Sequence, residues 1–113
     1  MCGQYLAVWE FQVKPEFVER FEQVYGGSGA WAALFRRSPE HLATELIRDL
    51  DHLGRYLTID RWTSREAFLR FKHDHAAEYA SFDENCEWLT LDERLIGHFE
   101  SFTPPASAPS PRP

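Results

Sequence analysis

Between positions 55 and 62 of this chain, every second residue has a polar or aromatic side chain, and the residues between them include Leu57 and Ile59. In a β-strand every second side chain points to the same face, so one face of the segment carries Tyr56, Thr58, Asp60 and Trp62. Aromatic rings, a hydroxyl and a carboxylate on a single face are poor material for a purely apolar core. The pattern therefore predicts the wall of a pocket that is partly polar and partly apolar.

Three side chains in or near this segment are candidates for catalysis. A carboxylate in a partly apolar site has a raised pKa, so Asp60 could accept a proton from a phenol; the alternative is a structural partner for a nearby Arg, Tyr or backbone N–H. Trp62 could donate its indole N–H to a carbonyl or phenolate oxygen and stack on a flat substrate, or it could be a core residue. His75 lies one helical turn beyond Phe71, where it could move a proton or simply hydrogen-bond at a helix end.

Further candidates are expected to bind a substrate without reacting with it. They are Thr58, Tyr56, Trp9, Phe68, Phe71 and Tyr79. Aromatic rings at strand and helix spacing also build ordinary cores. This set therefore describes either the lining of a pocket for a small aromatic molecule or the core beside it.

No sequence feature provides a cofactor or metal site. The five histidines are at positions 41, 52, 73, 75 and 98. His73 and His75 are two residues apart, so on a helix they point in different directions and cannot chelate one metal ion. The glycines at 26, 27 and 29 follow a helical pattern instead of a strand, which indicates a helix end and not a nucleotide-binding loop. We expect no metal, flavin or nicotinamide.

The composition is that of one compact domain. The chain has 113 residues, 43% of them hydrophobic and 15% aromatic, and its net charge is −6. Its basic residues are scattered, whereas binding to a phosphate backbone needs a concentrated basic surface, so we expect no nucleic acid partner. No apolar run reaches the roughly 20 residues of a membrane helix, and no signal peptide precedes the first strand pattern. We expect a cytoplasmic protein that does not bind membranes.

An alternation of strands and helices must position these candidates. Strand patterns cover residues 5–13, 42–50, 55–62 and 95–102, and helical patterns cover 15–25, the region between 28 and 38, and 64–88 in two pieces. Thr63 and Glu66 have the spacing of a capping box at the start of the last helical region. The order predicts an α+β fold, a ferredoxin-like βαββαβ antiparallel sheet with helices on one face. The domain spans 1–102, and 103–113 form a flexible tail rich in Pro, Ser and Ala.

The segment from Asp60 to Phe68 resembles a motif of the antibiotic biosynthesis monooxygenase superfamily, in which a strand ends in an acidic residue, one further residue and a tryptophan, followed by a helix start. The strand from Thr44 to Asp49 is similar to the second strand of that family. The resemblance covers roughly residues 4 to 102. It implies a dimeric α+β barrel in which two subunits pack sheet on sheet, and so a homodimer whose interface covers Leu57 and Ile59.

The resemblance also carries over individual positions. Trp62 matches a strand-end tryptophan that lines the pocket in some members. Thr58 stands where quinone-forming members can carry asparagine, and Phe68 where they can carry tyrosine, so two polar groups of that chemistry are absent. The haem-degrading branch fits less well, because residues 4 to 13 contain no asparagine and its helix tryptophan aligns with Phe71.

Two functions from different classes follow. The first is a cofactor-independent monooxygenase that deprotonates a phenol or quinol and lets the resulting anion reduce O2. In it, Trp62 would orient the substrate, with Asp60 or His75 handling protons. The second is a non-catalytic protein that binds a small molecule on the same fold.

Overall fold

The computed structural model describes residues 3–102, and the tail predicted at 103–113 lies outside the described residues. The strands are β1 (Gln4–Val13), β2 (His41–Arg48), β3 (Arg55–Trp62) and β4 (Thr90–Ser101). The helices are α1 (Val18–Tyr25), α2 (Ala30–Phe35), α3 (Arg65–Asp74) and α4 (Ala76–Cys86), with 3-10 turns at Pro15–Phe17 and Glu87–Leu89. The predicted βαββαβ order is confirmed, and the last helical region is indeed in two pieces.

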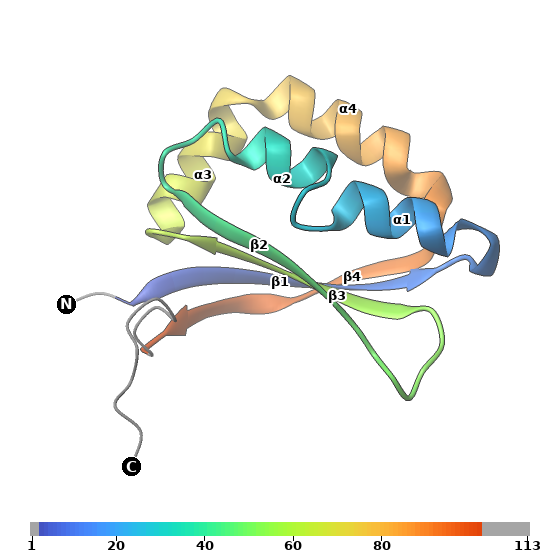
Figure 1. The fold of residues 1–113 in the computed structure, drawn as a ribbon. Coiled ribbons are helices and arrows are strands. Elements are labelled where there is room, and N and C mark those ends of the chain that lie inside the picture. The colour runs from blue at the N-terminus through green and yellow to red at the C-terminus, as the bar shows by residue number, and fades with distance from the viewer. Residues whose placement is uncertain (1–2, 103–113) are drawn as a thin grey trace, which may run out of the picture.

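The four strands form one antiparallel sheet in the order β2-β3-β1-β4. All four helices lie on the same face of this sheet (Figure 1). β3 and β1 are therefore the central strands, and their alternate residues point toward the helices. This arrangement confirms the predicted ferredoxin-like α+β fold, and it brings the polar face of β3 beneath the helical layer.

The layer between sheet and helices is built mainly from aromatic rings. Along β3, burial alternates residue by residue, with Tyr56, Thr58, Asp60 and Trp62 buried. β1 contributes buried residues at the matching positions of the same face, and α1 and α3 add Phe21 and Phe71. A sheet face of period two against helices of period 3.6 produces this continuous core.

Two predicted boundaries are wrong. The helix α3 is capped by Ser64, whose hydroxyl accepts a hydrogen bond from the Ala67 N–H at 3.1 Å, and not by Thr63, which is exposed. The strand β4 begins at Thr90 instead of residue 95, because its first residues pair with the end of β1 across a β-bulge. Both errors arise because tertiary pairing, and not local pattern, fixes where an element starts.

The other sheet face carries apolar side chains and a charged network. Leu6, Val8, Leu57 and Ile59 point to this face and are half-buried. Among residues 3–102, no helix covers it (Figure 1). We call it the open face.

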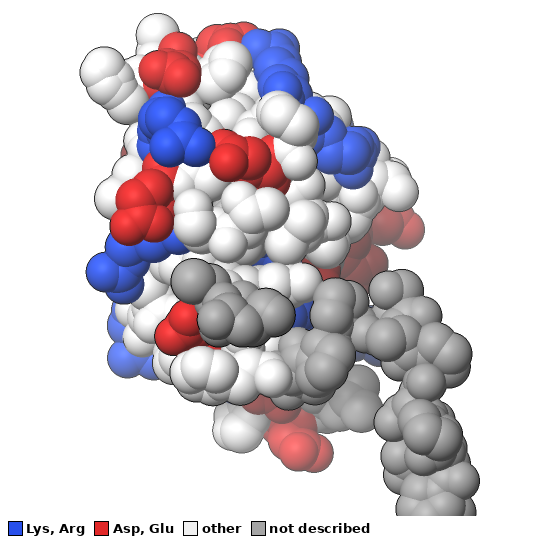
Figure 2. Space-filling view, turned by 90° about the vertical axis from the view of Figure 1, so that its left-hand side faces the viewer, with Lys and Arg blue, Asp and Glu red and all other residues white. Residues whose placement is uncertain are grey.

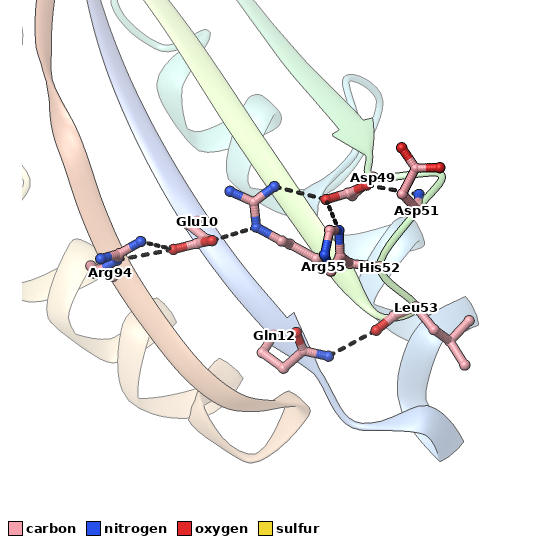
Figure 3. A network of polar contacts seen from close by, with 8 residues as sticks. All are labelled: Glu10, Gln12, Asp49, Asp51, His52, Leu53, Arg55 and Arg94. Atoms are coloured by element: carbon pink, nitrogen blue, oxygen red, sulfur yellow. Dashed lines mark hydrogen bonds and ion pairs between the residues drawn. The ribbon is translucent and has the colours of Figure 1, made fainter.

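The charged network lies at one end of the open face (Figure 3). Glu10 on β1 accepts hydrogen bonds from Arg55 on β3 and from Arg94 on β4, which ties three strands together. Arg55 also donates to Asp49 at 2.8 Å. Asp49 in turn accepts the N–H of Asp51 in the β2–β3 turn. The guanidinium groups of Arg55 and Arg94 lower the pKa of Glu10, so this carboxylate stays charged.

Elsewhere the surface charges are mixed. On the face shown in Figure 2, acidic and basic side chains are interspersed. Ion pairs join the turn after α2 to α4 through Arg37 and Glu78, and α3 to the segment before β2 through Arg70 and Glu40. Within the described residues, no helix has the length and apolar character needed to span a membrane.

Candidate functional site

A cavity of ≈ 190 Å³ lies between the sheet and the helices. Every strand and every α-helix contributes at least one side chain to its wall. The lining residues are Trp9, Phe11, Tyr25, Trp31, Phe35, Thr44, Thr58, Asp60, Lys72, Tyr79, Asp83 and Glu93. The cavity is smaller than the roughly 300–1,000 Å³ typical of sites for drug-sized ligands, so it suits a small molecule.

Asp60 is the buried charged group of this cavity. Strand alternation in β3 turns its side chain toward the helices, where it is only 8% exposed. Its Oδ1 accepts a hydrogen bond from the Thr44 hydroxyl at 2.8 Å, and Thr44 is its cross-strand partner on β2. Burial raises the pKa of Asp60 to about 6, with the Thr44 hydrogen bond acting in the opposite direction. Near neutral pH such a carboxylate is mostly ionised and readily takes up a proton.

Most of the remaining wall is aromatic. Trp31 on α2 is central to it, with its ring centroid 5.1 Å from that of Tyr79 and 5.7 Å from that of Phe35. Trp9 is half-buried on β1 at the same face. Rings held by contacts with one another present flat, rigid surfaces, which favour a flat aromatic ligand.

Charged side chains complete the wall toward solvent. The Lys72 ammonium lies 5.0 Å from the ring centroid of Tyr79 and 5.5 Å from that of Phe68, and its residue is exposed. Asp83 from α4 and Glu93 from β4 also line the cavity. Partial burial raises the pKa of Glu93, and the neighbouring charge of Asp83 adds to this effect. The cavity thus combines one cation with several carboxyl groups.

Four of the predicted site residues line the cavity: Asp60, Thr58, Trp9 and Tyr79. Thr58 is 4% exposed and lies one step along β3 from Asp60 on the same face. The polar face of β3 therefore forms part of the cavity wall, together with residues of β1 and α4. The chemical roles predicted for these residues stay predictions.

The structure places Trp62, Phe68 and Phe71 in the core behind this wall. Trp62 is 0% exposed, and its ring packs against Phe35, Phe68 and Phe71 with centroids 5.3 to 5.6 Å apart. A side chain without accessible surface cannot contact a ligand unless its neighbours move. Within the described residues the Trp62 Nε1–H has no hydrogen-bond partner, which is an unusual cost for a buried donor. Trp62 therefore packs behind Phe35, which lines the cavity, and does not itself line it.

Tyr56 and His75 also lie away from the cavity wall. The Tyr56 hydroxyl donates to the Glu22 carboxylate on α1, and burial raises the pKa of Tyr56. His75 lies between α3 and α4, where its Nδ1 is 3.1 Å from Glu78 Oε1 and its ring contacts Phe71. This is the helix-end hydrogen bond that was the alternative interpretation of His75.

Several lining residues were not predicted from the sequence. Thr44 could have been found from the register of β2 against β3, since it faces Asp60 directly. Trp31 and Phe35 have ordinary helical spacing and carry no signal that separates a pocket from a core. Glu93 was missed because β4 starts earlier than predicted. Within residues 3–102, no three His, Cys, Asp or Glu side chains gather as a metal site would require.

The fold and the cavity define a class of protein, a ferredoxin-like α+β domain with an aromatic pocket that contains a carboxylate between sheet and helices. A family model described as antibiotic biosynthesis monooxygenase matches residues 4–81. The chain therefore belongs to this family, as the resemblance implied. Comparison with curated proteins gives no match.

Solved structures share the fold. A putative antibiotic biosynthesis monooxygenase from Nitrosomonas europaea superimposes with a TM-score of 0.69 at 13% identity, covering 92% of this chain and 95% of that one. SnoaB, a cofactor-independent oxygenase from Streptomyces nogalater, has a TM-score of 0.65 at 23% identity, covering 90% and 96%. A putative family member from Bordetella bronchiseptica has a TM-score of 0.69 at 15% identity, covering 89% and 99%. At these identities the similarity shows the fold alone.

Proposed function

We propose that this protein is a cofactor-independent monooxygenase that oxidises a small phenol or quinol with O2. The observation that supports it most directly is Asp60, a carboxylate buried in an aromatic cavity with a pKa raised to about 6. A general base works best when its pKa lies near the working pH. The family match and the fold shared with SnoaB agree with this proposal.

The proposed reaction uses electrons from the substrate. Asp60 takes the proton of a phenol or enol, and the electron-rich anion gives one electron to O2. The substrate radical and superoxide then combine. The new C–O bond gives a peroxide on a carbon atom that still bears hydrogen. Loss of that hydrogen as a proton and cleavage of the O–O bond leave a carbonyl. The two protons removed from the substrate, one from its O–H and one from its C–H, convert the released oxygen atom to water, directly or by exchange with solvent. One O2 is consumed per substrate, and no flavin or metal is needed.

The test is oxygen uptake in air with 1-naphthol and 1,4-dihydroxynaphthalene as probes. We expect protein-dependent uptake that Asp60→Asn lowers about 10²–10⁴-fold, because the amide cannot accept the proton. Asp51→Asn is the matched control, since Asp51 is an exposed residue of the β2–β3 turn. Equal uptake by wild type and Asp60→Asn would contradict the role of Asp60.

The alternative is a small-molecule-binding protein without activity. One observation favours it: the Trp62 side chain has no accessible surface, so its indole N–H does not reach a ligand in this conformation. Binding of the same probes, measured by calorimetry, with no oxygen uptake across the series would support this alternative.

We also propose that a second copy of the chain covers the open face, giving a homodimer. The apolar side chains of that face support this, because Ile47 and Phe99 are 38% and 48% exposed in the single chain. Large apolar surfaces of this kind mark association sites. The family resemblance implies the same sheet-on-sheet packing.

A further inference from the structure

A hydrogen-bonded chain leads from the cavity carboxylate to a histidine. The Thr44 hydroxyl donates to Asp60 Oδ1 at 2.8 Å, and the same hydroxyl oxygen lies 2.9 Å from His41 Nε2. A hydroxyl can accept one hydrogen bond while it donates another. Asp60, Thr44 and His41 therefore form a continuous path in which every link is within hydrogen-bond distance.

A β-bulge makes this path possible. His41 and Thr44 are three residues apart, so in a regular strand their side chains would point to opposite faces. The pairing of β2 with β3 shifts register between His41 and Ala43, with His41 opposite Trp62 and Thr44 opposite Asp60. Bulges of this kind re-aim side chains. Both residues consequently face the helical side of the sheet.

His41 is held between aromatic rings at the edge of the core. Its ring centroid is 5.1 Å from that of Trp62 and 5.6 Å from that of Phe35. The residue is half-buried, so part of it reaches solvent, whereas Asp60 is 8% exposed. Burial and the nearby Arg36 lower the pKa of His41, while a hydrogen bond to the backbone of Ala43 opposes them. Near neutral pH this imidazole is neutral and able to accept a proton.

We propose that Thr44 and His41 form a proton relay that carries the substrate proton from Asp60 to solvent. This inference rests on the proposed function, in which Asp60 is the proton acceptor. It adds a role for two residues outside the motif that predicted the site. It also explains how Asp60 could be deprotonated again while a ligand fills the cavity and excludes water.

The relay alternates between two hydrogen-bond arrangements of Asp60, Thr44 and His41. After substrate deprotonation, neutral Asp60 donates its O–H to the Thr44 oxygen, and the Thr44 hydroxyl donates to the lone pair on His41 Nε2. Transfer breaks the O–H bonds of Asp60 and Thr44. It forms a new O–H bond on Thr44 and an N–H bond on His41 Nε2. The result is ionised Asp60 and a His41 imidazolium, which releases the proton on Nδ1 to water. Thr44 then donates to Asp60 and accepts a hydrogen bond from the Nε2–H of His41, the arrangement of the structure. Proton exchange of the half-buried ring with water returns the proton from Nε2 to Nδ1, so Nε2 has a free lone pair for the next turnover.

The titratable and charged groups that face the two ends of the relay are few. They are Arg36 beside His41 and Tyr5, Lys72, Tyr79, Asp83 and Glu93 beside or around the cavity of Asp60. The pKa of Tyr5 and that of Tyr79 are raised, chiefly by burial, so both stay neutral near pH 7. They do not compete with His41 for the proton.

The deciding measurement needs no ligand. The carboxyl carbon of Asp60 is titrated by NMR in wild type, Thr44→Val, His41→Gln and the double variant, with Thr44→Ser as the variant that keeps the hydroxyl. We expect Thr44→Val and His41→Gln each to shift the Asp60 titration by about half a pH unit or more, with strongly non-additive effects, because residues in one network are coupled. Thr44→Ser should titrate like wild type. Additive shifts, or no shift in Thr44→Val, would overturn the relay.

A second experiment follows the proton during turnover. With the naphthol probes, kcat for Thr44→Val should fall about 10-fold or more with KM nearly unchanged, and Thr44→Ser should restore it. His41→Ala should be rescued by added imidazole but not by thiazole, a ring of similar size that is far less basic. Rescue by both rings would show a packing role and overturn the relay. Absence of oxygen uptake in wild type would refute the oxygenase alone, and the ligand-free titration would still decide the relay.

Discussion

Asp60 is the residue in which stability and proposed function oppose one another. Its carboxylate loses most of its hydration on folding and gains a single hydrogen bond from Thr44. Burial of a charge without full compensation costs free energy, which appears here as a pKa raised from 3.8 to about 6. A group that is kept despite this cost is a candidate for chemistry.

The first prediction follows from the sign of this pKa shift. Between about pH 4 and 6 the folded state binds the Asp60 proton more tightly than the unfolded state, so stability falls as pH rises through this range. Asp60→Asn removes the buried charge and keeps an oxygen for Thr44. We expect it to stabilise the protein by about 3 kcal/mol at pH 7.5, from about two pKa units at 1.36 kcal/mol each. The gain should vanish near pH 4.

Urea unfolding of wild type and Asp60→Asn across pH 4–8 measures this difference. Asp51→Asn serves as the control, because Asp51 is exposed in the β2–β3 turn and its variant should track wild type at every pH. A pH-independent difference between Asp60→Asn and wild type would contradict the buried-charge explanation.

The second prediction concerns the tryptophans around the cavity. Trp31 lines it, whereas Trp62 is fully buried behind Phe35. A flat ligand should therefore quench the fluorescence of Trp31 more than that of Trp62. In titrations with 1-naphthol, the quenching of tryptophan fluorescence should be much smaller in Trp31→Phe than in wild type. In Trp62→Phe it should be nearly as large as in wild type. The reverse order would show that Trp62 contacts the ligand after a rearrangement of its neighbours.

At the scale of elements, α3 connects the end of β3 to the helical layer. Its first turn is capped by the Ser64 hydroxyl, which accepts the Ala67 N–H. Ala67 and Phe68 are buried directly after this cap, so the cap sets how the helix packs on the core. α3 also carries Lys72 to the cavity wall.

The third prediction separates the two candidate caps. Ser64→Ala leaves an N–H of the first turn without a partner and should destabilise the protein by about 1 kcal/mol. Thr63→Ala is the control and should change stability by less than about 0.5 kcal/mol, because Thr63 is exposed. Thermal or urea unfolding measures both. A larger loss in Thr63→Ala than in Ser64→Ala would restore the capping box predicted from the sequence.

Alternation and helical spacing are local signals. They indicate which residues of one strand or helix share a face, but not how that element pairs or packs with another. They identified the polar face of β3, and with it Thr58 and Asp60. They could not reveal that β4 begins at Thr90, since its first residues are exposed and are ordered by pairing with β1. They also could not reveal the contact of His41 with Thr44, because it depends on a bulge. Nor could they place Trp62 behind the cavity, since a buried ring and a lining ring have the same spacing.

At the scale of the whole molecule, the two faces of the sheet differ in what covers them. The helices cover one face, and the cavity lies between these two layers (Figure 1). The open face has apolar side chains at its centre and the Glu10 network at one end (Figure 3). An apolar centre with paired charges beside it is the usual anatomy of a protein–protein interface. The proposed homodimer would place both features in one contact.

The fourth prediction tests this assembly. Ile59 points to the open face from the central strand β3, opposite Val8 on β1. In a dimer, Ile59→Asp would bury an unpaired charge at the centre of the interface, which costs several kcal/mol. We expect light scattering to give a dimer for wild type at micromolar concentration and a monomer or aggregate for Ile59→Asp. Leu69→Asp is the matched control, because Leu69 is 54% exposed on α3, away from the sheet, and should leave the dimer intact. A monomeric wild type would contradict the proposal, and the open face would then be exposed in solution.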